Sequence, residues 1–180
     1  MRKVILSPYV TLDGIMEAPN EWSFQFWNDE LAKYKNDELF ASDALLLGRI
    51  TYQGFAAAWP TMEGTGEFGE RINSMTKYVA STTLTETEWN ATLIAGDVAD
   101  AVAALKQQPG QDILVWGSAD LAHTLMQHDL IDEYRLMVYP VIVGKGKRLF
   151  KDGIGSPTLQ LVDTQTTSTG VVILTYRPAE

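Results

Sequence analysis

The chain of 180 residues contains no cysteine. A disulfide framework is therefore excluded, and so is any zinc site built from thiolates, including the zinc centre of the nucleotide deaminases with its Cys-x-x-Cys pair. The absence of cysteine also removes the composition typical of small exported domains. The function must come from chemistry that needs no thiol.

Positive charge is scarce as well, since 14 Lys and Arg residues stand against 23 Asp and Glu residues and give a net charge of −9. Nucleic acids and anionic membranes are bound by basic surfaces, so we expect neither as a partner. The apolar run at the N-terminus, Val4–Leu6, is far too short for a signal peptide or a membrane span, and we expect a cytoplasmic protein. A small anionic ligand stays possible, because a few cations and helix ends are enough to bind one.

The apolar and charged fractions, 46% and 21%, are those of an ordinary globular protein, and we expect one domain over residues 1–180. Hydrophobic periodicity predicts alternating strands and helices. The expected strands are 3–10, 44–47, 77–80, 113–116 and 130–143; the expected helices are 27–38, 49–59, 68–75, 98–108 and one that starts after residue 118; the expected hairpin is 159–166 with 171–176. This order predicts an α/β fold with a mostly parallel central sheet, helices on both faces and an antiparallel C-terminal hairpin.

The stretch Asp112–Leu125 has the clearest local pattern. An apolar run ends at Gly117, and helical spacing resumes at Leu121, so the pattern predicts a strand, a tight turn and a helix with Ser118 as its N-cap. The first N–H groups of a helix are free and its dipole favours negative charge there. The junction is therefore either a phosphate site or a plain connection between a strand and a helix.

Two more strand ends carry similar residues, Gly48-Arg-Ile-Thr51 and Ser81-Thr-Thr83. Arginine binds phosphate in a bidentate manner, and hydroxyl groups and helix N–H groups complete such a shell. Ligands of open α/β sheets bind at the carboxyl ends of the strands. Three such strand ends together favour a dinucleotide with several phosphates.

Gly48-Arg-Ile-Thr51 also resembles the G-R-x-T motif of dihydrofolate reductases. The rest of the chain resembles their bacterial relatives, the group related to the reductase domain of the bifunctional riboflavin biosynthesis deaminase-reductase. The resemblance extends from about residue 3 to residue 176 and includes Thr11-Leu-Asp-Gly14, Val115-Trp-Gly-Ser-Ala-Asp-Leu121 and Pro140-Val-Ile-Val-Gly-Lys-Gly-Lys-Arg-Leu-Phe150. It implies a dihydrofolate reductase-like fold, NADPH as cofactor and a homodimer.

Carried over by position, the resemblance places Arg49 at the 2′-phosphate of NADPH, with the hydroxyls of Ser81 and Thr82 beside it. It places Ile15 in the loop over the nicotinamide. The residues expected to flank the pyrophosphate are Gly48, Thr51, Gly117, Ser118 and Ala119. Dihydrofolate reductases usually have a second glycine where this chain has Ser118, which disfavours classical folate reduction.

The catalytic and substrate residues follow less directly. The carboxylate that holds the pterin in dihydrofolate reductases would fall near Ala32, so we consider Asp13 and, on a helix flank roughly 60° from its apolar stripe, Glu30. Trp22 and Trp27 are candidates for stacking on a flat substrate, and we expect no metal.

Two functions stay open at this point. The first is NADPH-dependent hydride transfer to a small flat nitrogen heterocycle, of the pterin or ribosylaminopyrimidine type, like that of 5-amino-6-(5-phosphoribosylamino)uracil reductase. The second is an NADP(H)-binding sensor with little catalytic activity, which the missing folate-type carboxylate motivates.

Overall fold

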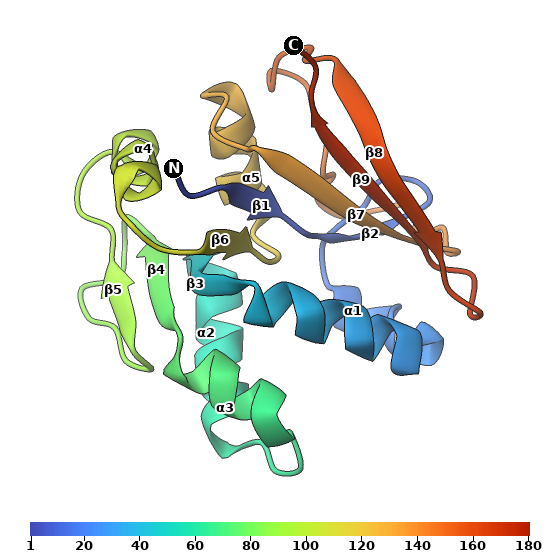
Figure 1. The fold of residues 1–180 in the computed structure, drawn as a ribbon, viewed down its shortest axis with the longest axis horizontal. Helices are drawn as coiled ribbons and strands as arrows, with labels where there is room; N and C mark the ends of the chain where they lie inside the picture. The colour runs from blue at the N-terminus through green and yellow to red at the C-terminus, as the bar shows by residue number, and fades with distance from the viewer.

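The computed structural model describes all residues, 1–180, and its strands form one sheet in the order β5-β4-β3-β6-β1-β7-β9-β8, with β2 paired to β7 (Figure 1). The strands are β1 (Val4–Leu6), β2 (Tyr9–Thr11), β3 (Ser42–Gly48), β4 (Thr76–Ala80), β5 (Ala91–Leu93), β6 (Asp112–Val115), β7 (Glu133–Tyr139), β8 (Leu159–Thr166) and β9 (Val172–Pro178). The helices are α1 (Asp29–Phe40), α2 (Arg49–Ala58), α3 (Gly66–Ser74), α4 (Val98–Gln107) and α5 (Ala119–Gln127). Short 3-10 turns cover 19–21, 24–26 and 59–61.

Strands β1 to β7 pair in parallel, whereas β9 runs antiparallel to both β7 and β8. The central strands β1, β3 and β6 are almost continuously buried, as expected for parallel strands that are covered on both faces. The predicted fold class, a mostly parallel sheet with an antiparallel C-terminal hairpin, is confirmed.

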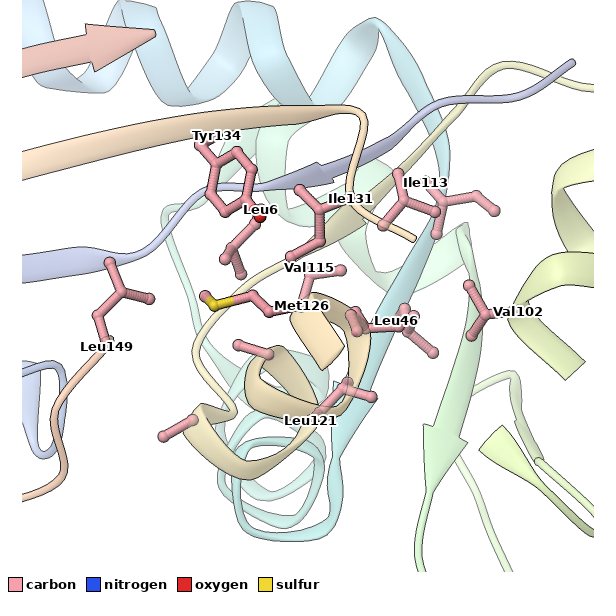
Figure 2. Packing of buried hydrophobic residues seen from close by; sticks show 14 of the residues in the cluster. Leu6, Leu46, Val102, Ile113, Val115, Leu121, Met126, Ile131, Tyr134 and Leu149 are labelled. Atoms are coloured by element: carbon pink, nitrogen blue, oxygen red, sulfur yellow. The ribbon is translucent and has the colours of Figure 1, made fainter. Parts of the chain in front are cut away.

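Helices cover both faces of the sheet. One core cluster packs α4 and α5 against the sheet, and Figure 2 shows Leu121 and Met126 of α5 next to Leu6, Leu46 and Val115 of the strands. A second cluster joins α1, α2 and α3 to the opposite face through Leu39, Tyr52 and Ile72. Both clusters contain residues with no exposed surface, so both faces of the sheet are closely packed.

Several predicted boundaries are wrong. The strand predicted at 3–10 is two strands, because Pro8 between them has no N–H to give and its carbonyl oxygen instead accepts from the Met137 N–H at 3.1 Å. The strand predicted at 130–143 is β7 alone, which ends directly before Pro140. None of the five helices is long and apolar enough to cross a membrane.

Helix α1 begins at Asp29 instead of Trp27. Its N-cap is Asn28, whose Oδ1 accepts from the Leu31 N–H at 3.0 Å and satisfies one of the free donors of the first turn. The buried face of this helix is formed by Leu31, Lys35, Glu38 and Leu39. Two charged side chains therefore occupy core positions.

Candidate active-site cleft

A cleft of about 1840 Å³ lies at the carboxyl ends of the parallel strands. Its lining includes the first residues after four of them: Ser7 after β1, Arg49 after β3, Ser81 after β4 and Trp116 after β6. This is where ligands of open α/β sheets bind. Pockets for one small molecule usually measure about 300–1,000 Å³, so the cleft has room for two ligands side by side.

Two helix N-termini meet in this cleft, those of α2 and α5. The backbone at Gly117 adopts a φ of 61°, and a Cβ added there would lie 2.8 Å from Thr51 Oγ1. Only glycine allows so close an approach at that φ. Since the first N–H groups of each helix have no partner within the helix, the junction presents free donors and two positive dipole ends to the cleft.

Ser118 holds the two helix starts together. Its Oγ accepts from the Gly48 N–H at 2.8 Å, across 70 residues of chain, and donates to the Trp116 carbonyl at 3.4 Å. Ser118 is the N-cap residue of α5, as predicted, but it adopts a left-handed conformation with φ 66° and its side chain makes no capping hydrogen bond. The hydroxyl group fixes the geometry between the helices instead.

Arg49 lines the cleft next to this junction and is exposed. Its one side-chain partner is the neutral Gln53 Oε1 at 3.2 Å, and no carboxylate pairs with it. Ser81 and Thr82 line the same cleft at the end of β4, the strand next to β3. An unpaired guanidinium and nearby hydroxyl groups are the donors that bind a phosphate.

Part of the cleft lining is apolar. Four large apolar side chains line the cleft and are still strongly exposed, although they come from three segments: Phe24 (73%) and Trp27 (47%), Ile50 (68%), and Met62 (46%). Exposed apolar groups that gather at one concave site indicate a binding surface. Trp22, predicted beside Trp27, instead is buried against Tyr139 with its ring edge-on at 5.4 Å, outside the cleft.

A buried ion pair lies where the central strands β1 and β6 end. Lys35 lines the cleft but is only 5% exposed, and its Nζ lies 2.7 Å from Glu38 Oε2 and 3.2 Å from Ser7 Oγ. The Nζ also stands 4.4 Å from the centroid of the Trp116 ring, a cation–π contact. Burial lowers the pKa of Lys35 from 10.5, while the charge of Glu38 opposes that shift.

Glu38 is the centre of this group. Besides Lys35, its carboxylate accepts from Trp116 Nε1 at 3.0 Å and from Arg135 at 3.4 Å. Arg135 in turn donates to Glu133 at 2.7 Å. Each buried charge thus has an opposite charge within contact distance, which is the condition for keeping it ionised.

Of the predicted residues, the structure brings Gly48, Arg49, Thr51, Ser81, Thr82, Gly117, Ser118, Ala119 and Trp27 together around the cleft. Four others lie outside it: Trp22, Ile15, Asp13 and Glu30. The Ile15 side chain is buried. The Asp13 carboxylate accepts hydrogen bonds from the Thr11 hydroxyl and from the Val143 and Gly144 N–H groups, and these bonds lower its pKa. Asp13 therefore shapes a turn.

Glu30 also lies outside the cleft, so its position on the flank of the apolar stripe of the helix does not bring it to the site. Its carboxylate accepts from the Ser168 N–H at 2.9 Å and from Asn28 Nδ2 at 3.2 Å, and the Ser168 bond is the main cause of its lowered pKa. It ties the start of α1 to the turn between β8 and β9.

Sequence reasoning missed Lys35 and Glu38. A signal existed, because both stand at helical spacing from the buried Leu31 and Leu39, positions i+4 and i+7 of the core stripe. Charged residues at two core positions of one helix indicate either a wrong helix phase or a functional pair.

The comparisons with known proteins agree with this geometry. The family model described as the RibD C-terminal domain matches residues 2–173. The chain is 34% identical over 181 residues to the uncharacterized protein YyaP of Bacillus subtilis (strain 168), covering 97% of this chain and 94% of that protein.

Two solved structures share the fold. One is a protein from Shewanella sp. PV-4 that is provisionally assigned to riboflavin biosynthesis, with a TM-score of 0.80, 20% identity and full coverage of both chains. The other is the diaminohydroxyphosphoribosylaminopyrimidine deaminase/5-amino-6-(5-phosphoribosylamino)uracil reductase of Thermotoga maritima, with a TM-score of 0.68 and 17% identity, over 99% of this chain and 57% of that chain.

Proposed function

The chain belongs to the RibD C-terminal domain family, which has a riboflavin-type, dihydrofolate reductase-like fold, and we propose that it is an NADPH-dependent reductase of a small flat nitrogen heterocycle. The substrate is of the pterin or ribosylaminopyrimidine type, as in 5-amino-6-(5-phosphoribosylamino)uracil reductases. One observation carries the proposal: an unpaired arginine and two helix N-termini line one half of a cleft that has room for a second ligand. NADPH when bound supplies a hydride.

The residues of the cleft fit this cofactor. Arg49 and the hydroxyls of Ser81 and Thr82 would hold the 2′-phosphate, which carries the charge that distinguishes NADPH from NADH. The pyrophosphate would lie against the helix starts at Thr51 and Ser118, with Gly48, Gly117 and Ala119 beside them. Arg49 has no carboxylate partner although the chain has a net charge of −9. Its guanidinium group is therefore available to an external anion.

The remaining half of the cleft suits a flat ring. Trp27 lies at its mouth with Phe24, Ile50 and Met62, and flat heterocycles bind to such surfaces by stacking and apolar contact. The nearby Lys33 is paired with Asp37 one turn along α1. This half of the cleft therefore favours a neutral ring over a strongly anionic one.

Cofactor titration tests the proposal, with protein fluorescence as the signal for NADPH and NADH binding. Loss of one charge-assisted contact costs about 1.5–3 kcal/mol, so Arg49→Ala should weaken NADPH binding roughly 10- to 150-fold and leave NADH binding unchanged. Arg148→Ala, which removes an exposed arginine outside the cleft, is the matched control. Equal loss of both cofactors in Arg49→Ala, or no loss, contradicts the 2′-phosphate assignment.

Turnover separates the reductase from the NADP(H)-binding sensor. A reductase oxidises NADPH when it is supplied with one member of a panel of pterins, flavins and aminopyrimidines. Tight NADPH binding without oxidation by any of them favours the sensor instead.

We also propose a homodimer. Strand β8 is an edge strand of eight residues with a register irregularity between Leu161 and Asp163, where Leu161 (49%) and Val162 (43%) are exposed. Exposed apolar side chains on a sheet edge form a surface that a second copy of the chain can cover. Sedimentation should show a dimer for the wild type and a monomer for Val162→Lys. A monomeric wild type contradicts this arrangement.

A further inference from the structure

Reduction of a C=N bond needs a proton on the nitrogen as well as a hydride on the carbon. We propose that Lys35 donates this proton and that Glu38 positions its ammonium group. The inference rests on the proposed function, because it concerns the acid that such a reductase requires.

The composition of the cleft singles out Lys35. The two carboxylates in its lining are occupied: Glu17 Oε2 accepts from the Lys147 N–H at 2.9 Å, and Asp120 is paired with Lys147 Nζ at 2.7 Å. Tyr9 also lines the cleft, but burial raises its pKa well above 10 and makes it a weak acid. The cleft contains no histidine.

Lys35 also occupies the right position. Its Nζ lies within 3.2 Å of Ser7, directly after β1, and over the ring of Trp116, directly after β6. The next residues of the chain, Gly117 and Ser118, belong to the proposed pyrophosphate site. The ammonium group therefore lies in the cleft wall, next to the segment assigned to the pyrophosphate.

Burial and the neighbouring charges change the pKa of Lys35. Burial favours the neutral amine, and this is the largest effect on its pKa; Glu38 on the same helix favours the ammonium, and Arg135 of β7 disfavours it. Tyr9 of β2 faces it with a ring centroid 5.4 Å away. A lysine whose pKa is lowered by burial releases its proton more readily than an exposed lysine does.

The step balances as follows. The hydride from the nicotinamide cofactor, the reductant of the proposed function, forms the new C–H bond of the substrate. The Lys35 Nζ–H bond breaks while the N–H bond of the product forms. Lys35 becomes a neutral amine and regains its proton from water, while Glu38 keeps its charge throughout.

Two substitutions of Lys35 test the role, with N,N′-dimethyllumazine as the probe because it is a flat pteridine with C=N bonds and no acidic N–H. Lys35→Met removes the proton, and Lys35→Arg keeps the charge on a group that does not release it. We expect both to lower kcat with NADPH by about 10²- to 10⁴-fold, the usual contribution of a general acid. We expect both to keep NADPH affinity within about twofold.

Binding of the same pteridine gives a readout that does not depend on turnover. In the wild type its affinity should fall as the pH rises and Lys35 loses its proton; in Lys35→Met and Lys35→Arg this pH dependence should disappear. The matched control is Lys77→Met, which removes another buried lysine stacked on a tryptophan ring (3.9 Å from the Trp89 centroid) outside the cleft. It should lower stability but keep both pH profiles.

The outcomes are distinguishable. If the wild type reduces the pteridine and the Lys35 variants keep its rate and pH profile, the inference about Lys35 is wrong and the proposed function stands. If the wild type binds NADPH but neither binds nor reduces any flat heterocycle, the proposed function fails and the role of Lys35 fails with it. If Lys77→Met reproduces the loss of pH dependence, the effect is one of stability and Lys35 is not the acid.

Discussion

Replacing Glu38 by Gln should destabilise the protein strongly and make its stability depend on pH. Glu38 is 1% exposed in its side chain and touches Lys35, Trp116 and Arg135. Gln preserves the shape and one acceptor but removes the charge that balances the buried ammonium. Breaking a buried ion pair in this way costs about 3–5 kcal/mol.

The cost of neutralising Lys35 sets a similar upper limit on the loss of stability. Lys35 can give up its proton in the variant, and neutralising a lysine of ordinary pKa 10.5 at pH 7 costs about 5 kcal/mol, because each pKa unit corresponds to about 1.4 kcal/mol. The loss of stability is set by the smaller of these two costs, that of leaving the ammonium unpaired and that of neutralising it. We therefore expect a loss of about 3–5 kcal/mol near neutral pH.

The sign of the pH dependence follows from linkage. In Glu38→Gln the charge that opposes the lowering of the Lys35 pKa by burial is gone, so this pKa falls further in the folded variant, while the unfolded chain keeps the ordinary value of 10.5. Stability of the variant should then rise relative to the wild type by up to about 1.4 kcal/mol per pH unit. This rise extends from the folded Lys35 pKa of the variant to the higher folded Lys35 pKa of the wild type, above which both folded proteins hold a neutral amine. The pKa of Lys77, lowered to about 8 by burial, acts in both proteins and cancels in the difference.

Urea unfolding followed by tryptophan fluorescence at several pH values from about 6.5 to 9 measures this difference. The double variant Lys35→Met with Glu38→Gln should lose the extra slope and be more stable than Glu38→Gln alone. A loss below about 1 kcal/mol, or a difference between variant and wild type that stays constant with pH, would refute the coupling of Glu38 to Lys35.

Two further changes test the two halves of the cleft. Ser118→Ala removes the partner of the Gly48 N–H and should cost about 1–3 kcal/mol in urea unfolding, whereas Ser118→Gly should be less damaging by about 1 kcal/mol because glycine tolerates the φ of 66°; equal losses contradict the strain argument. Trp27→Ala should raise the KM for the heterocycle roughly 2- to 12-fold, the value of one aromatic contact, with NADPH affinity unchanged. Phe150→Ala, at the same 47% exposure but outside the cleft, should change neither.

The sheet and the phosphate-type residues were predictable because their signals are local. Apolar runs that end at Gly48 and Gly117 indicate strand ends, and parallel strand ends must meet at one edge of the sheet. Strand β5 was missed because it has only three residues, Ala91–Leu93, none of them fully buried, and so it shows no periodic pattern. Its place in the sheet follows from pairing with β4, which is a long-range contact.

The errors in the site have the same physical origin. The sequence shows that Ser118 precedes a helix, but its true partner, the Gly48 N–H, is 70 residues away. Starting α1 two residues too early placed the apolar stripe on Trp27 and hid Lys35 and Glu38. Their partners Ser7, Trp116 and Arg135 lie after β1, after β6 and within β7, far from α1 in the sequence, so no local pattern reveals them.

The identity of the cleft acid bears on the substrate. The resemblance puts the position of the folate-type carboxylate near Ala32, which lines the cleft but carries no polar group, so that carboxylate is missing here. Lys35 lies three residues later on the same face of α1 and brings an ammonium to that part of the cleft. A carboxylate accepts hydrogen bonds from the N–H edge of an aminopyrimidine, whereas an ammonium can only donate. The ring edge that meets Lys35 must therefore present an acceptor, a C=N or C=O group, and folate-type recognition through paired N–H donors does not fit this cleft.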